Sequence, residues 1–130
     1  HDALPISWVG FYLHAPDAPG ASDQQPLILG PRRDKPACSP IGLHGVCGQS
    51  FTTRSVRIVH DVKDLGDDYI ACDPRDRSEI VLPMIEENDD SPQPPCWGVL
   101  DLDSFDVGAF TTHDEEGLRT ALNAAGLRTA

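Results

Sequence analysis

The sequence predicts a single α+β domain in which helices flank an antiparallel sheet. Three observations point to this class: short strand-like segments are separated by glycine- and proline-rich loops, a short helix interrupts their succession, and the last segment has helical periodicity. The 130 residues, of which 39% are hydrophobic, suffice for one domain with a buried core. We therefore expect residues 1–130 to form one domain.

The first half of the chain contains two predicted strands and one helix. No element is predicted over His1–Ile6. The aromatic-rich Trp8–Leu13 and the short apolar Pro26–Gly30 are predicted strands, joined by the loop Ala15–Gln25, which is rich in Pro, Gly, Asp and Ser. After a polar, proline-punctuated stretch, Gly45–Arg54 is predicted to be a short helix that begins near a glycine turn.

The second half adds three strands. They are Val56–Val59, Ser78–Met84 and Gly98–Asp103, the last with clear alternation of apolar and polar residues. His60–Asp68 is polar and is predicted to be a loop or a short helix. The acidic, proline-rich Glu86–Pro95 is predicted to be an extended hairpin loop.

A helix is predicted to end the chain, over Asp114–Leu127. Within it Leu118 and Leu122, together with neighbouring alanines, recur at helical spacing. Thr112 or Asp114 is the expected N-cap, and acidic residues in the first turn suit the helix dipole.

The charge balance excludes some classes of partner. Net charge is −11, from 21 acidic and 10 basic residues, which disfavours nucleic acid and anionic membranes as ligands. No apolar run approaches the roughly 20 residues that a membrane span needs. Four cysteines without a secretory signal indicate a reducing compartment, so we expect a cytoplasmic protein that binds a small molecule.

Three of the cysteines could carry chemistry. Cys72 precedes Arg75 and Arg77, whose charge could lower the pKa of its thiol, although most unpaired cysteines are small buried hydrophobes. Cys38 and Cys47 lie in segments with proline or glycine, where a mobile cysteine could attack an oxidised one. Metal ligation and packing are the alternatives, but the paired spacings of a zinc site are absent. Cys96 receives no role.

Carboxylates and aromatic residues suggest a pocket on one face of the sheet. Asp101 and Asp103 are two residues apart in a strand and therefore point the same way, with Glu79 on another predicted strand. The alternative is an exposed edge face. Trp8 and Tyr12 also share a parity, so they could line one pocket while Phe11 enters the core.

Six segments carry a resemblance to a known family: WVGFYL (8–13), KPAC (35–38), GVCG (45–48), YIACD (69–73), SEIVLP (78–83) and GVLDLDS (98–104). Together they resemble the free methionine-(R)-sulfoxide reductase family of GAF domains. The resemblance implies a GAF fold and covers nearly the whole chain from Trp8 onward. In the family, helical sequence precedes the first strand; only seven residues precede Trp8 here, so we expect the N-terminal helix to be missing. The insertion Glu86–Trp97 is longer and more acidic than the family pattern.

The resemblance implies the chemistry of each matched cysteine. Cys72 matches the catalytic cysteine, which attacks the sulfoxide sulfur and becomes a sulfenic acid. Cys38 matches the resolving cysteine that forms a disulfide with it, and Cys47 matches a third cysteine that assists resolution or recycling. An external dithiol such as thioredoxin then reduces the disulfide. The resemblance implies no metal and no bound organic cofactor, and it is compatible with a homodimer.

The resemblance also implies a binding site for free L-methionine-(R)-sulfoxide. Clustered carboxylates raise one another's pKa, and one of them can therefore protonate the departing oxygen. The alternative function is a GAF domain that senses a small ligand without turnover. The matched binding residues are Glu79, Asp101 and Asp103, for the sulfoxide oxygen and amino group, and Trp8 and Tyr12, which enclose the methyl end.

Overall fold

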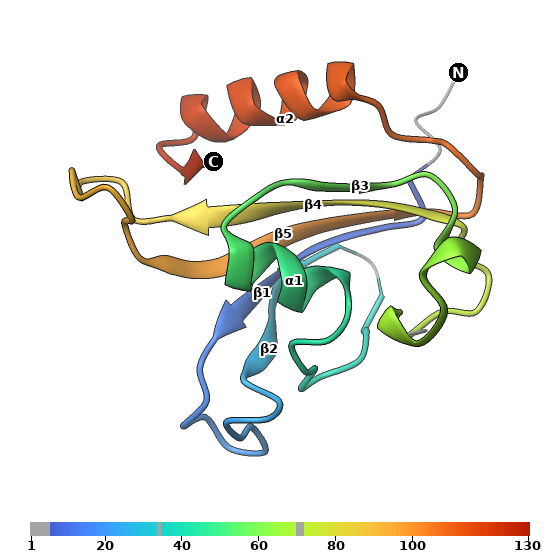
Figure 1. The fold of residues 1–130 in the computed structure, drawn as a ribbon, viewed down its shortest axis with the longest axis horizontal. Helices are drawn as coiled ribbons and strands as arrows, with labels where there is room; N and C mark the ends of the chain where they lie inside the picture. Colours follow the sequence, from blue (N-terminus) through green and yellow to red (C-terminus); the bar gives the residue numbers. More distant parts are fainter. Residues whose placement is uncertain (1–5, 34, 70–71) are drawn as a thin grey trace.

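The structure is a computed structural model that describes residues 6–33, 35–69 and 72–130. At its centre lies an antiparallel sheet in which the order of the strands differs from their order along the chain. Its strands follow the order β2-β1-β5-β4-β3, and β6 pairs with the end of β4 (Figure 1). This arrangement confirms the predicted α+β class. The strands are β1 (Trp8–His14), β2 (Leu27–Arg32), β3 (Arg57–Val59), β4 (Ser78–Ile85), β5 (Cys96–Ser104) and β6 (Arg128–Thr129).

Helices lie on both faces of this sheet. The terminal helix α2 (Thr112–Ala124) covers one face, whereas α1 (Val46–Thr53) lies on the opposite face (Figure 1). A short 3₁₀ segment, η1 (Val62–Asp68), follows β3. The predicted helix at Gly45–Arg54 is confirmed, with Gly45 as its N-cap and Arg54 in the left-handed region at its end. Among the described residues, no helix combines the length and apolarity needed to cross a membrane.

Three predicted boundaries are wrong for identifiable reasons. Helix α2 begins at Thr112, two residues earlier than predicted, because Thr111 is its N-cap, and Asp114 completes a capping box instead of acting as the cap. The helix stops before Gly126, which has a φ of 80°, and the next residues form β6, for which no strand was expected. Strand β2 continues through Pro31, which is tolerated because β2 lies at the edge of the sheet.

The remaining predicted elements agree with the structure. The hairpin between β4 and β5 spans the predicted acidic loop, which the hydrogen bond from Glu86 N to Pro95 O closes at 2.9 Å. Residues 1–5, within the segment for which no element is predicted, lie outside the described residues. The same holds for Asp34 in the proline-punctuated stretch and for residues 70–71 of the YIACD motif.

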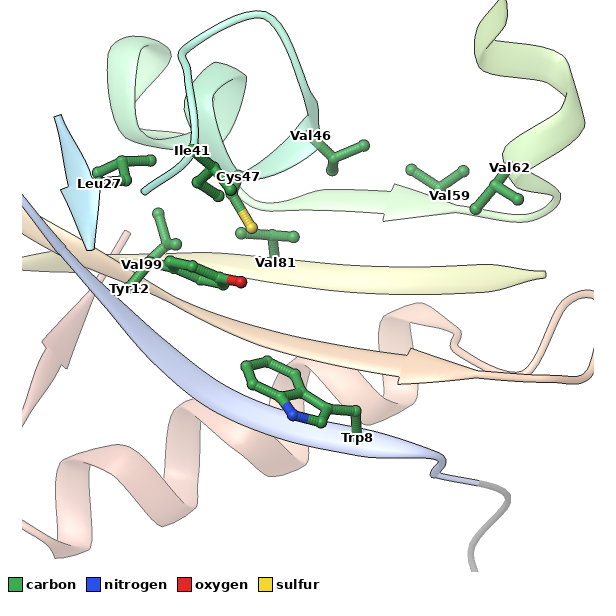
Figure 2. Packing of buried hydrophobic residues seen from close by; sticks show 10 residues of the cluster. All are labelled: Trp8, Tyr12, Leu27, Ile41, Val46, Cys47, Val59, Val62, Val81 and Val99. Carbon is green, nitrogen blue, oxygen red and sulfur yellow. The ribbon is translucent and has the colours of Figure 1, made fainter. Parts of the chain in front are cut away.

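The alternating side chains of the sheet produce two separate cores. Beneath α2, the strand residues are aliphatic and pack against Phe110 and Leu122 of the covering segment. The half-buried Phe11 also packs on this side. The other face carries Trp8 and Tyr12 beside aliphatic residues, and α1 closes it with Val46 and Cys47 (Figure 2). The strand residues beneath α2 are Ile80, Leu82, Met84, Leu100 and Leu102.

Candidate active site

Three carboxylates lie together on the face of the sheet that α1 covers. In the register of the sheet, Asp103 is opposite Glu79 on β4 and opposite Trp8 on β1. Asp101 is the next residue of β5 on the same face. The side chains are buried, with exposed fractions of 6% for Glu79, 5% for Asp101 and 9% for Asp103. The exposed-edge alternative is wrong, because β5 lies between β1 and β4.

Burial gives these carboxylates unusual acidity. Removal from water raises the pKa of Asp101 well above its ordinary value, and the negative charge of Asp103 raises it further. Burial likewise raises the pKa of Asp103, and the negative charge of Glu79 raises it further. The pKa of Glu79 is raised by burial, although hydrogen bonding with Asp101 and Asp103 opposes that effect. The group is therefore expected to retain protons at a pH where an ordinary carboxyl group is ionised.

Two aromatic residues of β1 form a wall beside the acids. Trp8 and Tyr12 lie on the same face, with ring centroids 6.1 Å apart. Between them Gly10 leaves the room that the indole needs, because a Cβ at that position would overlap the Trp8 ring. The indole Nε1 donates a hydrogen bond to Lys35 O at 3.0 Å, and Tyr12 Oη donates one to Cys38 O at 2.7 Å. The loop that carries Cys38 is thereby attached to the aromatic wall.

Cys38 and Cys72 form a disulfide across the mouth of the site, with 5.5 Å between their Cα atoms. Cys72 is exposed and Cys38 half-buried. The positive potential expected from the following arginines is partly offset. Arg75 pairs with Asp73 at 2.9 Å and lowers the pKa of that carboxyl group to about 2, while Arg77 pairs with Asp61 at 3.2 Å.

The third candidate cysteine lies inside the site. Cys47 is buried in the first turn of α1, and its side chain points toward the sheet (Figure 2). Burial raises the pKa of its thiol, and the charges of Glu79 and Asp103 raise it further. One ligand atom from each of Cys47, Glu79 and Asp101 lies within 4.8 Å of the other two, so these residues form a group that could hold a metal ion. Cys96 lies at the start of β5, and both cysteines are free in the described structure.

A cavity of about 130 Å³ connects these groups. It is close in size to an engineered cavity of roughly 150 Å³ that accepts benzene, so it suits a small molecule. Every residue predicted for the site lines it except Cys38, which joins it through the disulfide. The lining residues predicted from the sequence are Trp8, Tyr12, Cys47, Cys72, Glu79, Asp101 and Asp103.

Sequence reasoning missed several residues of the cavity. Asp76 is buried there, accepts a hydrogen bond from Ser7 Oγ at 3.0 Å, and has a pKa raised by burial. It lies in a loop, where no strand parity could reveal its direction. Lys35 and Tyr69 also line the cavity. Both belong to segments that carry the resemblance, and this was the one sequence signal that could have identified them.

The arrangement has the parts of a thiol-based reduction. A redox-active cysteine pair requires two thiols that can close a disulfide, and the structure contains that bond at the cavity. A leaving oxygen requires an acid, and carboxyl groups whose pKa is raised by burial line the cavity. An aromatic wall provides an apolar contact surface for the rest of a small ligand.

Comparison with known proteins gives a consistent result. The GAF domain family matches residues 1–128. The free methionine-R-sulfoxide reductase of Escherichia coli K12 is 42% identical over 116 residues, which cover 88% of this chain and 61% of the relative. The enzyme of the same name from Saccharomyces cerevisiae is 38% identical over 117 residues, covering 89% of this chain and 59% of the relative. The chain thus spans about three-fifths of the length of these two proteins.

Solved structures share the fold. The X-ray structure of free methionine-R-sulfoxide reductase from Neisseria meningitidis, in complex with its substrate, superposes with a TM-score of 0.66 and 36% sequence identity. The match covers 84% of this chain and 58% of that one.

Proposed function

The chain belongs to the GAF-domain family, and on that premise we propose that it reduces free L-methionine-(R)-sulfoxide to methionine. The observation that carries the proposal is the Cys38–Cys72 disulfide at the mouth of a cavity walled by three buried carboxyl groups. The sequence identity of 42% and 38% with two free methionine-R-sulfoxide reductases supports the choice of substrate. A sensor domain needs the cavity, but it has no need of a cysteine pair able to close a disulfide there.

The proposed reaction uses two thiols and releases water. The Cys72 thiolate attacks the sulfoxide sulfur and the oxygen receives a proton. The sulfur–oxygen bond of the substrate then breaks as the hydroxyl group passes to Cys72 Sγ, so methionine leaves and Cys72 becomes a sulfenic acid. The Cys38 thiol then displaces the sulfenic hydroxyl group as water, and the disulfide forms. The sulfur of the substrate is reduced by two electrons, and the two thiols are oxidised by two.

The buried acids have two proposed roles in this reaction. A carboxyl group whose pKa is raised by burial keeps a proton that it can give to the sulfoxide oxygen. The charge that remains on the group attracts the ammonium of a free amino acid. Trp8 and Tyr12 are proposed to enclose the methyl end, because they supply the aromatic wall of the cavity.

Recycling is proposed to occur at the disulfide. Cys72 is exposed, so an external dithiol of the thioredoxin type can approach its sulfur and reduce the bond. Cys47 is buried and its pKa is raised, which makes it a weaker nucleophile than an exposed thiol. We assign it an assisting role, exercised when Cys38 cannot react. Cytoplasmic location, assembly as a homodimer and folding of residues 1–130 as one domain remain predictions.

The test compares turnover with binding. Purified protein, reduced beforehand, is incubated with each sulfoxide epimer, both as the free amino acid and within a peptide, and a dithiol. We expect loss of the free R epimer only. The Cys72→Ser variant should lose this activity because a hydroxyl is a far weaker nucleophile at neutral pH, whereas the matched Cys96→Ser control should keep it. Saturable binding without turnover would instead establish a sensor.

A second variant tests the resolving role. In Cys38→Ser, the reaction with one equivalent of substrate should leave Cys72 as a sulfenic acid or bonded to Cys47. Mass spectrometry distinguishes these products. If the unchanged protein forms no Cys38–Cys72 bond after turnover, the assignment of Cys38 is wrong.

A further inference from the structure

The group formed by Cys47, Glu79 and Asp101 has a property that the proposed reaction does not use. Its ligand atoms come from α1, β4 and β5, yet each lies within 4.8 Å of the others. All three side chains are buried and line the same cavity. The paired cysteine and histidine spacings of a zinc finger could not indicate such a site, because the three ligands lie on separate elements.

Asp101 provides an independent sign that this group can accept a ligand. Asp101 is only 5% exposed. One of its two carboxylate oxygens, Oδ1, is buried without a hydrogen-bond partner among the described residues, apart from the hydrogen bonding that the carboxyl group shares with Glu79. A buried acceptor without a partner is costly, and proteins normally satisfy it with a donor, a water molecule or an ion. The unpartnered atom belongs to a residue that lines the cavity.

The composition of the group selects one class of ion. A thiolate with two carboxylates suits a thiophilic divalent cation such as Zn²⁺, which takes three protein ligands and keeps a fourth position open. Mg²⁺ and Ca²⁺ prefer six or more oxygen ligands and do not favour sulfur. In a tetrahedral zinc site the sulfur and oxygen ligands are about 3.5 Å apart. The three side chains therefore need to move by only about 1 Å to close around the ion.

We propose that the cavity binds one Zn²⁺-type cation through Cys47 Sγ and the carboxylates of Glu79 and Asp101. The thiol proton, and any proton held by the two carboxyl groups, passes to solvent on binding, and neither the metal nor the sulfur changes oxidation state. The bound ion occupies the carboxylates assigned above to the ammonium and to the departing oxygen. It is thus a reversible inhibitor competing with the sulfoxide, a consequence that rests on the proposed function. The binding itself does not rest on it.

Cobalt provides a direct probe of the sulfur ligand. In the oxidised protein the Cys38–Cys72 bond removes two thiols, which leaves Cys47 and Cys96 free. We expect titration with Co²⁺ under nitrogen to produce a thiolate-to-cobalt charge-transfer absorption that saturates at one equivalent and that Zn²⁺ abolishes. Cys47→Ser should lose the absorption, and the matched variant Cys96→Ser should retain it. Absence of the absorption in the unchanged protein, or its persistence in Cys47→Ser, would overturn the proposal.

A carboxylate variant covers the case in which Cys47→Ser does not fold. Asp101→Asn retains the thiol and the size of the side chain, so we expect the same absorption with at least tenfold weaker Co²⁺ binding. Unchanged affinity in the folded Asp101→Asn protein would refute the assigned ligand set.

Kinetics separate this proposal from the proposed function. Zn²⁺ should raise the apparent KM for the sulfoxide while leaving kcat unchanged. A saturable cobalt absorption in a protein without turnover would support the metal site and refute the enzyme. Turnover without the absorption would support the enzyme and refute the metal site.

Discussion

The two faces of the central sheet use alternate residues of the same strands for different purposes. On the face beneath α2, β4 and β5 contribute Ile80, Leu82 and Leu102, and the packing there is aliphatic and aromatic. On the other face the neighbouring positions Glu79 and Asp103 are acids that border a cavity. A shift of one residue in the register would exchange the two faces.

Within one strand, the residues that stabilise the fold thus lie on one face and the candidate reactive residues on the other. Burying an aliphatic side chain stabilises the fold by roughly 1.5–3 kcal/mol, whereas a buried carboxyl group is costly unless it is protonated or paired. The acids at positions 79, 101 and 103 lie where they oppose folding, and the aliphatic face compensates for them. Substitutions on the two faces should therefore have opposite signatures in stability and in activity.

The largest expected effect concerns the acidic face. Asp101→Asn and Asp103→Asn should each lower turnover by about 10²–10⁴-fold, because each removes a candidate proton donor and a negative charge. The thermal midpoint should stay the same or rise, since like-charge repulsion is relieved. Rate and melting are measured on the same preparations. Wild-type turnover in both variants would reduce these residues to structural ones, and unfolding would show that the carboxylates are needed by the fold.

The aliphatic face should respond in the opposite way. Leu82 is 0% exposed, and Leu82→Ala should reduce the free energy of unfolding by about 2–5 kcal/mol through lost burial and the cavity left behind. Turnover per folded molecule should not change. Urea denaturation provides the measurement. The control is Leu43→Ala, at a residue 37% exposed, which should remain within about 0.5 kcal/mol of the parent. Loss of turnover in folded Leu82→Ala would break the separation between the faces.

The pH dependence of stability sharpens the comparison further. The pKa of Asp101 is raised by burial in the folded protein, so the folded state binds its proton more tightly than the unfolded chain. Its contribution to stability is complete below the ordinary carboxyl pKa of about 4 and is lost as the pH rises through the raised pKa. In metal-free buffer, the stability of Asp101→Asn should consequently decline less with rising pH. An identical slope in the two proteins would contradict the burial argument.

The half-buried Asp73 should show the opposite pH dependence of stability. Hydrogen bonds from Arg75 lower the pKa of Asp73 to about 2. The stabilising effect of Asp73 is therefore present above the ordinary carboxyl pKa and lost as the pH falls toward 2. Asp73→Asn should therefore lower stability at neutral pH and lose this deficit as the pH falls toward 2. The deviation of Asp101→Asn from the parent should instead develop as the pH rises above about 4.

The smallest expected effect lies at the start of the covering helix. Thr111 Oγ1 accepts a hydrogen bond from His113 N, and Thr111 N donates one to Asp114 Oδ2. Thr111→Ala should lower the free energy of unfolding by about 1 kcal/mol without changing turnover, whereas Thr111→Ser should retain the cap. A larger loss of turnover than of stability would mean that α2 influences the cavity.

Local sequence patterns predicted which residues belong to the site, whereas the pairing of distant strands determined how deeply those residues are buried. Residue parity correctly placed Asp101 and Asp103 on one face with Leu100 and Leu102 on the other. It could not reveal their burial, because β1, which pairs with the other side of β5, comes from a distant part of the chain. Parity is also silent in loops, which is why Asp76 was missed.

Helix ends and disulfide pairing show the same contrast between what local sequence predicts and what distant contacts determine. The N-terminal cap of α2 was expected at Thr112 or Asp114 and lies at Thr111, since an argument from residue type does not distinguish neighbouring threonines. The two residues of β6 give only a weak local signal for a strand, and they form one because they pair with β4. The Cys38–Cys72 pairing came from the family resemblance, and spacing alone left metal ligation and packing open.

The attachment of the Cys38 loop to two aromatic side chains makes the molecule its own optical reporter. The Trp8 indole and the Tyr12 hydroxyl group hold the carbonyls of Lys35 and Cys38. The sequence has one other tryptophan, Trp97. It stacks on Phe11 on the face of the sheet beneath α2, with ring centroids 6.3 Å apart. Release of the loop on reduction would change the surroundings of one fluorophore and leave the other as an internal reference. Emission from unlabelled protein would then follow the redox state of the cysteine pair during a single turnover.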